Sequence, residues 1–202
     1  MVRQLDLFAA PAVAFDPAFR GLVRHDLLHD AWVEHVPGWV SGHDLLFDEL
    51  EARLAWKAET MKMYDRTVDV PRLLASVSKT GAGQPMIEQM RVALSARYGE
   101  EFVRTTAALY RDGKDSVAFH GDTTARDLDK ALVATVSLGQ PRRFLMKPTE
   151  GGESIAFPAG RGDLIVMGGT AQRTWRHGIP KVAHAGPRIA LMFRPAWSRT
   201  YG

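Results

Sequence analysis

The sequence contains no cysteine among its 202 residues. This absence excludes a disulfide framework and any metal site built on thiolates, and with it most structural zinc modules. A metal ion in this protein must therefore be held by histidine and carboxylate side chains. A chain of this length buries enough apolar surface to fold without such cross-links.

Long apolar runs are also missing. No uninterrupted stretch approaches the roughly 18 residues of a membrane-spanning helix. Residues 1–11 lack the basic segment followed by an apolar run that marks a secretory signal. We therefore expect a cytoplasmic protein that makes no membrane contact, and we expect it to be a monomer.

An excess of either charge is almost absent. Lysine and arginine number 26 against 23 aspartates and glutamates, which gives a formal net charge of +3. With 46% hydrophobic and 24% charged residues, the composition is that of one ordinary globular domain. The mild basic excess is compatible with phosphate or carboxylate partners but does not identify them.

The first hundred residues predict two helices. Ser41 has the side chain of an N-cap for a helix that runs to about Lys57, and leucines recur at every fourth position from Leu46 to Leu54. A second helix is predicted over 85–99, because proline suits its first turn and glycine its end. Both helices therefore offer an apolar stripe for packing.

The second half of the chain predicts many short strands. Gly, Pro and Asp separate runs of apolar or β-branched residues at 102–110, 131–138, 142–147, 154–157, 163–167 and 188–194. Residues 63–79 also have extended character with a turn. Many short strands at regular spacing are typical of a sandwich or barrel. We predict an α+β protein whose N-terminal helices pack against a C-terminal double-sheet barrel.

Three residues have the chemistry of a metal site. His120 and Asp122 project from one face if they share a strand, because residues i and i+2 do so. His177 follows the predicted strand at 163–167. Two histidines and one carboxylate form the facial triad of non-haem Fe(II) oxygenases, which leaves coordination positions for a bidentate cosubstrate and O2.

Two arginines follow the second histidine. Arg188 and Arg194 are six residues apart, so on one strand they share a face. A buried arginine is costly unless it is paired with an anion, and a dicarboxylate cosubstrate would supply one. The same pattern also fits exposed arginines with the apolar residues between them facing inward. Periodicity does not choose between these readings.

The span 109–194 resembles the AlkB family of 2-oxoglutarate-dependent nucleic-acid dealkylases. The resemblance rests on an ordered series of short motifs: Leu109-Tyr110-Arg111, Lys114-Asp115-Ser116-Val117, His120-x-Asp122, Val136-Ser137-Leu138-Gly139 with Arg142-Arg143-Phe144, Gly162 to Met167, Trp175 with His177-Gly178-Ile179-Pro180, and Arg188 to Arg194. Upstream, Val70-Pro71-Arg72 resembles a short substrate-recognition motif. The combination is specific, although no single piece is.

The resemblance implies a fold and a set of roles. The fold would be a double-stranded β-helix, or jelly-roll, barrel in a single domain of residues 1–202. Residues 1–100 would supply helices and a substrate-recognition lid, and residues 101–202 the catalytic core. Fe(II) would be held by His120, Asp122 and His177. Arg188 would bind the distal carboxylate of 2-oxoglutarate, catalytic Arg194 would lie near its chelating end, and Tyr110 would donate a hydrogen bond to it.

The implied substrates are N-alkylated bases in single-stranded or damaged DNA, or in RNA, which are oxidised by O2 and 2-oxoglutarate. The residues expected to contact substrate are Arg72, Tyr64 and Thr124. A basic groove is expected from Arg66, Arg72, Arg142, Arg143 and Arg173. Three departures from the family pattern stand out: Ala108 and Ala190 replace asparagines, and Thr123-Thr124 replaces an acid that would stabilise a cationic base.

Other functions remain open from the sequence. The same barrel and cofactors serve hydroxylases of protein side chains or small molecules, because fold and cofactor do not fix the substrate. A non-catalytic module that retains the barrel is a second alternative, but it does not explain the intact triad. A zinc hydrolase with two histidines and one aspartate is a third, and it gives no reason for the two arginines.

Overall fold

The structure, a computed structural model, describes residues 12–63, 66–78, 81, 83–122, 125 and 128–196. The side chains of residues 59–63 and 66–70 are outside this description. Tyr64 and Thr124, both expected to contact substrate, lie outside the described residues, and so does the side chain of Arg66. Antiparallel sheet dominates the described part, and helices are few.

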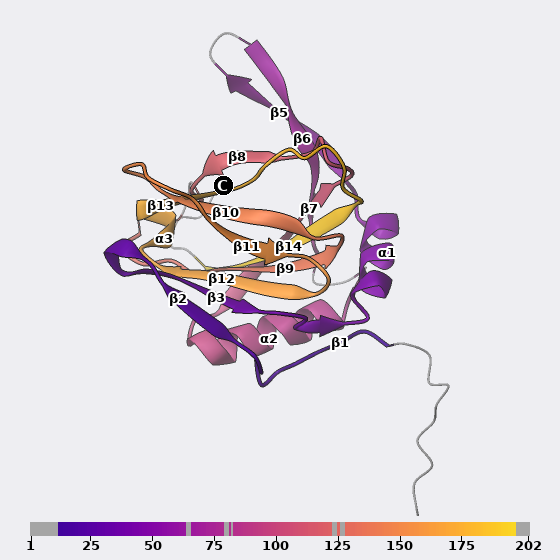
Figure 1. Cartoon of the computed structure of the whole chain (residues 1–202). Coiled ribbons are helices and arrows are strands. Elements are labelled where there is room, and N and C mark those ends of the chain that lie inside the picture. Colours follow the sequence, from indigo (N-terminus) through magenta and orange to yellow (C-terminus); the bar gives the residue numbers. More distant parts are fainter. Residues whose placement is uncertain are drawn as a thin grey trace, which may run out of the picture.

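The larger layer is an eight-stranded antiparallel sheet (Figure 1). Its strands follow the order β2-β3-β12-β9-β14-β7-β6-β5. Their bounds are Val23–Asp26 (β2), Ala31–Val36 (β3), Asp163–Gly169 (β12), Val133–Gly139 (β9), Arg188–Pro195 (β14), Phe102–Tyr110 (β7), Arg66–Ser76 (β6) and Lys57–Met63 (β5). The sheet therefore joins strands from both halves of the chain.

The smaller layer is a four-stranded antiparallel sheet with the order β11-β10-β13-β8. Its strands are Ile155–Ala159 (β11), Arg142–Pro148 (β10), Trp175–Ile179 (β13) and Val117–His120 (β8). The remaining elements are short: β1 (Ala14–Phe15) paired with β4 (Val40–Ser41), the 3-10 turn Leu28–Asp30, and α3 (Ala171–Thr174). All six strands predicted after residue 100 are confirmed, with shifts of a few residues at their ends.

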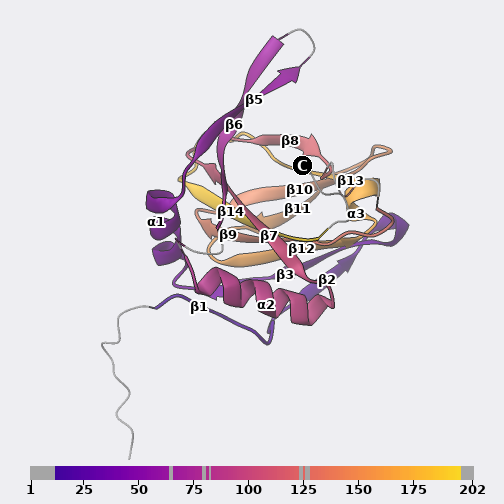
Figure 2. The same cartoon turned by 180° about the vertical axis from the view of Figure 1, so that it is seen from behind.

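Two longer helices, α1 (His43–Arg53) and α2 (Met86–Tyr98), lie on the outer side of the large sheet (Figure 2). Their buried residues, among them Leu46, Leu50 and Leu94, share one apolar cluster with Val136 and Leu191 of the sheet. The predicted second helix is confirmed, and Gly99 ends it in the left-handed conformation at φ 68°. The large sheet is thus covered on its outer face.

The boundaries predicted for the first helix are wrong. It begins at His43, after Gly42 in the left-handed conformation, and it ends at Arg53. Ser41 lies in β4, where its hydroxyl donates to the Ala14 carbonyl instead of capping the helix. Lys57 begins β5. The fourfold leucine spacing predicted the buried stripe correctly but not where the helix ends.

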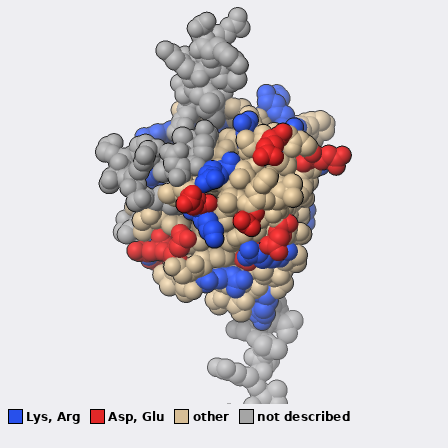
Figure 3. Space-filling view, turned by 90° about the vertical axis from the view of Figure 1, so that its left-hand side faces the viewer, with Lys and Arg blue, Asp and Glu red and all other residues tan. Residues whose placement is uncertain are grey.

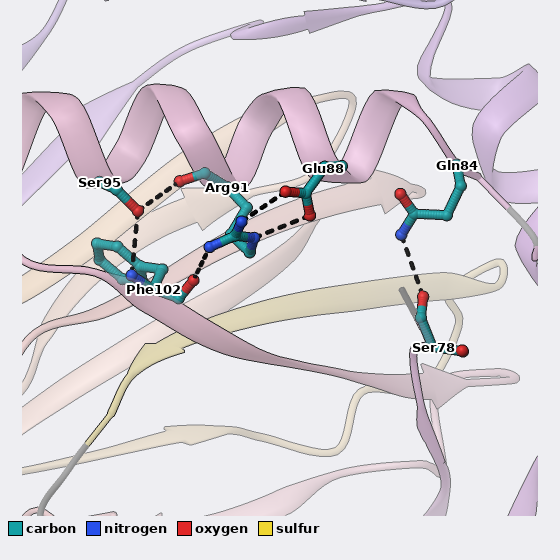
Figure 4. Close-up of polar contacts among 6 residues, drawn as sticks. All are labelled: Ser78, Gln84, Glu88, Arg91, Ser95 and Phe102. Carbon is teal, nitrogen blue, oxygen red and sulfur yellow. Dashed lines mark hydrogen bonds and ion pairs between the residues drawn. The ribbon is translucent and has the colours of Figure 1, made fainter. Parts of the chain in front are cut away.

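Polar contacts fasten α2 to the start of β7 (Figure 4). Arg91 Nη1 donates to the Phe102 carbonyl at 2.5 Å, and the Phe102 N–H donates to the Ser95 hydroxyl at 3.0 Å. At the other end of the helix, Gln84 Nε2 donates to the Ser78 carbonyl at 3.1 Å. These bonds attach one end of the helix to the start of β7, the strand that carries Tyr110, and the other end to the segment after β6.

The two faces of β14 enter two different cores. Ile189, Leu191 and Phe193 belong to the cluster shared with the helices, whereas Ala190 belongs to a second cluster between the two sheets. Both faces of the strand are therefore covered. The residues in phase with Ala190, including Arg188, face the space between the sheets, which resolves the alternative that periodicity left open.

The N-terminal strands were not predicted from the sequence. Strand β3 is buried along most of its length, including Glu34 and His35, so it shows no alternation of polar and apolar residues. Glu34 accepts a hydrogen bond from Tyr98 at 2.8 Å, and His35 Nε2 lies 3.5 Å from an Asp163 oxygen. These partners come from distant parts of the chain.

Strands β5 and β6 pair as an antiparallel hairpin, in agreement with the extended structure predicted for residues 63–79. Strand β6 pairs with β7 at the edge of the large sheet, and the far part of the hairpin projects from the body (Figure 1). No helix in the described ranges is long and apolar enough to cross a membrane.

Candidate active site

A cavity of about 620 Å³ lies between the two sheets. Its walls come from strands of both layers and from the base of the β5–β6 hairpin. Arg72 lines the cavity. So do all the predicted metal and cosubstrate residues: His120, Asp122, His177, Arg188, Arg194 and Tyr110. Residues that are far apart in the sequence therefore line one cavity.

Two imidazoles lie side by side in this cavity. His120 ends β8 and His177 lies in β13, and the register of the two strands places them directly opposite each other. Their ring centroids are 4.3 Å apart. The ring of Phe144 stacks on His177, with centroids 5.5 Å apart and planes inclined by 21°. Phe144 thus fixes the plane of one imidazole.

Both imidazoles are poised to be neutral. Burial lowers the pKa of His177 well below its ordinary value, and the positive charges of His120, Arg194 and Arg72 lower it further. Burial also lowers the pKa of His120, against the raising effect of the Ala118 carbonyl. His120 Nδ1 lies 2.9 Å from that carbonyl oxygen. This contact favours a proton on Nδ1 and leaves the Nε2 lone pair for a metal.

Asp122 enters the cavity from beyond the strand. Strand β8 ends at His120, so the two residues do not share a strand as predicted. The Asp122 N–H donates to Gln172 Oε1 at 2.9 Å, and Arg194 Nε donates to Asp122 Oδ2 at 2.6 Å. In the part of the chain that the structure describes, no three His, Asp or Glu side chains are grouped closely enough to hold a metal. The imidazole pair is assembled, whereas the carboxylate is turned to Arg194.

Arg188 is a buried guanidinium with an unused donor. Its residue is only 1% exposed. Nη2 donates to the Ser137 hydroxyl at 2.8 Å, Nε donates to the Ala159 carbonyl at 3.3 Å, and the guanidinium lies 5.2 Å from the centre of the Tyr110 ring. Nη1 has no hydrogen-bond partner among the described residues. A buried cation with an unpaired donor is costly unless an anion joins it.

Arg72 approaches the same end of the cavity. Its Nη1 donates to the Tyr110 hydroxyl at 3.4 Å, and its Nε has no hydrogen-bond partner among the described residues. The structure thus places Arg72 beside the expected cosubstrate site, on strand β6. A contact between Arg72 and nucleic acid stays a prediction.

Arg142 does not line a surface groove, so that expectation was wrong. The residue is 4% exposed. Its guanidinium donates to the carbonyl oxygens of Asp112, Asp115 and Pro180 at 3.0, 2.9 and 2.6 Å. It also lies 5.8 Å from the centre of the Tyr110 ring. Arg142 therefore holds together the loops next to Tyr110. Arg143 and Arg173, also expected in the groove, are exposed.

Four residues of this site did not emerge as functional from the sequence: Gln172, Ser137, Thr106 and Phe144. Thr106 accepts a hydrogen bond from Arg194 Nη1 at 2.9 Å. Ser137 gave one signal, because it is one of only two hydroxyl residues, with Thr135, in a mostly apolar strand. Gln172 gave none, since only the folding of α3 brings it to Asp122.

Comparison with known proteins agrees with this geometry. A family model for the 2OG-Fe(II) oxygenase superfamily matches residues 82–194. Alpha-ketoglutarate-dependent dioxygenase alkB homolog 3 of Bos taurus is 29% identical over 185 residues, covering 80% of this chain and 65% of that protein. DNA oxidative demethylase ALKBH2 of Arabidopsis thaliana is 26% identical over 189 residues, covering 73% of this chain and 60% of that protein. The chain thus spans less than two thirds of the length of either relative.

A solved structure shares the fold. An oxidoreductase of the 2OG-Fe(II) oxygenase family from Burkholderia pseudomallei superposes with a TM-score of 0.55 at 19% identity, covering 83% of this chain and 89% of that chain. At this identity the likeness concerns the fold alone. The family model, by contrast, covers more than half of the chain, including both histidines and both arginines. This protein belongs to the 2OG-Fe(II) oxygenase superfamily, and AlkB homologues are among its relatives.

Proposed function

We propose that this protein is an Fe(II)- and 2-oxoglutarate-dependent dioxygenase that oxidatively demethylates N-alkylated bases in DNA or RNA. One observation carries the proposal: a buried Arg188 with an unpaired Nη1 shares a cavity with two adjacent imidazoles. The buried arginine needs an anion, and the two imidazoles suit a metal ion. A dicarboxylate that chelates the metal at one end would bind the arginine with the carboxylate at its other end.

We further propose that the two sheets form the double-stranded β-helix of this superfamily. Residues 101–202 would supply its catalytic core, and the β5–β6 hairpin within residues 1–100 would act as the lid over substrate. The pairing of β6 with β7 supports this arrangement, because it anchors the hairpin at the rim of the cavity. A single domain would span the chain, and the sharing of the large sheet by strands from both halves supports this.

The donor types present, two neutral imidazoles and one carboxylate, suit an iron(II) ion, provided that Asp122 turns from Arg194 toward the imidazoles. His120 and His177 would bind it through neutral imidazole nitrogens, and Asp122 would add a carboxylate. Arg194 engages Oδ2 of that carboxylate, which leaves the second oxygen for the metal. Gln172 fixes the backbone of Asp122. Such supporting bonds orient ligands around a metal site.

Arg188, Tyr110 and Arg72 would receive the distal carboxylate of 2-oxoglutarate. A charge-assisted bond to Arg188 Nη1 would satisfy its unused donor. When bound, iron and 2-oxoglutarate supply the oxidation of a methyl C–H bond by O2.

A nucleobase fits the site only after leaving its stack. Base flipping costs a few kcal/mol and costs least in single strands or at damaged pairs. The names of the relatives, a dioxygenase homologous to AlkB and a DNA oxidative demethylase, support a nucleic-acid substrate for this chain. We therefore favour single-stranded or damaged DNA, and RNA as a second polymer.

The test is anaerobic reconstitution with Fe(II) and 2-oxoglutarate, followed by exposure to O2 with methylated oligonucleotides. We expect a charge-transfer absorption band on cosubstrate binding, and loss of one methyl group per turnover by mass spectrometry. His177→Ala should abolish both. Consumption of 2-oxoglutarate with no change in DNA or RNA would refute the nucleic-acid substrate and favour a protein or small-molecule hydroxylase.

A further inference from the structure

The small sheet contains no acidic residue. Its four strands read VAFH, RRFLMKP, IAFPA and WRHGI, and all of their residues are described. They hold four permanent cations and not one Asp or Glu: Arg142, Arg143, Lys147 and Arg176. Arg142 is buried in its three carbonyl contacts, so three cations remain for the surface.

These three cations share the outer face of the sheet. Arg143 and Lys147 alternate with the buried Phe144 and Met146, which face the other sheet. Lys147 pairs directly with the exposed Arg176 across β10 and β13. Directly opposed side chains of like charge destabilise a sheet. Within the described part of the chain, no carboxylate lies within ion-pair distance of Arg143, Lys147 or Arg176 to offset that repulsion.

Nearby acidic residues do not neutralise this face. Glu150 and Glu153 lie in the connection between β10 and β11. Glu150 Oε2 lies 3.7 Å from His29 Nε2, and Asp129 pairs with Arg173 at 3.0 Å. By contrast, a neighbouring side of the molecule carries basic and acidic residues intermixed (Figure 3). Within the four strands themselves, the outer face of the small sheet therefore carries charge of one sign, and its cations form no ion pair with the described carboxylates.

A hollow borders this face and shares one lining residue with the central cavity. It has a volume of about 350 Å³, and its walls include Phe119, Thr149, Arg173 and Arg176. His120 lines both the hollow and the central cavity. Phe119 is 40% exposed beside it. An exposed aromatic ring next to unpaired cations is the combination by which proteins hold single-stranded nucleic acid.

We propose that the outer face of the small sheet binds the phosphodiester backbone of the substrate strand. Arg176, Lys147 and Arg143 contact successive phosphates, and Phe119 stacks on a base that neighbours the one in the cavity. Arg143 and Lys147 are four residues apart on one strand, about 13 Å, which a few nucleotides span. This inference rests on the proposed function, since it concerns the same nucleic-acid strand whose methylated base would enter the cavity.

The test compares two double variants that remove the same charge. Lys147→Gln/Arg176→Gln changes the proposed surface. Arg20→Gln/Arg53→Gln changes two exposed arginines, one between β1 and β2 and one on α1, that form only surface ion pairs. The probe is a labelled single-stranded oligonucleotide of about 12 nucleotides carrying one methylated base. Binding is titrated at several salt concentrations with the full chain loaded with Fe(II) and 2-oxoglutarate.

For the surface variant we expect the slope of log affinity against log salt to become less negative by about 1.4, because each phosphate contact on a single strand contributes about 0.7. The control variant should keep the wild-type slope. Equal slopes in the surface variant and the wild type would overturn the inference. If wild type neither binds nor demethylates the oligonucleotide, the proposed function itself fails.

Phe119 gives a second, independent readout. Phe119→Leu keeps apolar bulk but loses the ring, so oligonucleotide affinity should fall about tenfold. Phe119→Trp should restore it, because stacking needs only an aromatic face. A structural role would respond to the loss of volume and would not be rescued by the larger ring. Retention on phosphatidylserine vesicles without oligonucleotide binding would assign the surface to membranes and overturn the inference.

Discussion

Arg188 is a single side chain whose surroundings define a ligand. It is buried, it is held by Ser137 and Ala159, and its Nη1 points to no acceptor among the described residues. Burial lowers the pKa of this guanidinium, which expresses the cost of keeping it charged without an anion. Its counter-charge must come from a bound molecule.

Arg188→Ala should therefore raise the 2-oxoglutarate concentration needed for half-saturation by about 100-fold or more. Breaking a buried charge pair costs about 3 kcal/mol or more, because one partner is stranded. Calorimetric titration of the Fe(II)-loaded protein under anaerobic conditions measures the effect. Oligonucleotide affinity, titrated separately, should change little. Arg194→Ala should lower turnover more than cosubstrate affinity, and equal cosubstrate affinity in Arg188→Ala and wild type would contradict the assignment.

The buried Arg142 contributes to the stability of the fold. Arg142→Met keeps a long apolar stem but leaves three carbonyl groups, one buried and two partly buried, without their donor. We expect the free energy of unfolding to fall by about 2 kcal/mol, because a buried acceptor left unpaired costs about 1 kcal/mol or more and a partly buried one costs less. Urea denaturation measures it. Arg143→Met, one residue along and exposed, is the matched control and should change stability by less than about 0.5 kcal/mol.

Two turns, one at the end of α2 and one before β12, depend on glycine for different reasons. Gly99 and Gly162 both have positive φ, 68° and 88°. A Cβ at Gly99 would meet open space, whereas a Cβ at Gly162 would lie 2.0 Å from the Val40 carbonyl oxygen. The Gly162 carbonyl also accepts a hydrogen bond from the Val40 N–H at 2.9 Å. One glycine is needed for its conformation alone, the other also for its lack of a side chain.

Gly99→Ala should lower the free energy of unfolding by about 1 kcal/mol, the cost of a left-handed non-glycine residue. Gly162→Ala should lower it by about 3 kcal/mol or more, because steric overlap adds to the backbone strain. Thermal or urea unfolding of the two variants side by side measures the difference. Similar losses in both would show that the β4 segment moves aside freely.

The whole molecule sets the electrostatic character of the cavity. Five cations line it, against one carboxylate, Asp122: Lys57, Arg72, Arg104, Arg188 and Arg194. A 2-oxoglutarate dianion and an Fe(II) dication would cancel each other. Apart from Asp122, the described residues that line the cavity thus provide no negative charge for a cationic base. At the position where the AlkB pattern has an acidic residue, this sequence has Thr123 and Thr124.

We therefore expect the enzyme to discriminate in favour of neutral methylated bases such as 3-methylthymine over cationic ones such as 1-methyladenine. Removing a cation at the rim with Arg104→Gln should shift the ratio of kcat/KM toward the cationic base by about threefold to tenfold, because an exposed charge acts through a high dielectric. Formaldehyde release from paired single-stranded oligonucleotides measures the ratio. A strong preference for 1-methyladenine in wild type would show that a carboxylate outside the described residues reaches the substrate.

Local pattern was enough to predict much of this protein. Strand-length apolar runs predicted the six strands after residue 100, and the proline and glycine boundaries predicted α2, since these signals depend on neighbours along the chain. Residue type and spacing singled out His120, Asp122, His177, Arg188 and Arg194 as candidates, and the resemblance to the AlkB family supplied their expected roles. Local pattern did not predict the strands that carry the two histidines, β8 and β13.

Only the tertiary structure decided what depends on distant partners. Strand β3 escaped prediction because its Glu34 and His35 are buried beside Tyr98 and Asp163, so the strand lacks the usual alternation of polar and apolar residues. The face of β14 that carries Arg188 was undecided because helices cover one side of the sheet and a second sheet covers the other. From the sequence, Arg142 was expected at the surface. In the structure, carbonyl groups of three residues, Asp112, Asp115 and Pro180, converge on its guanidinium, which is buried.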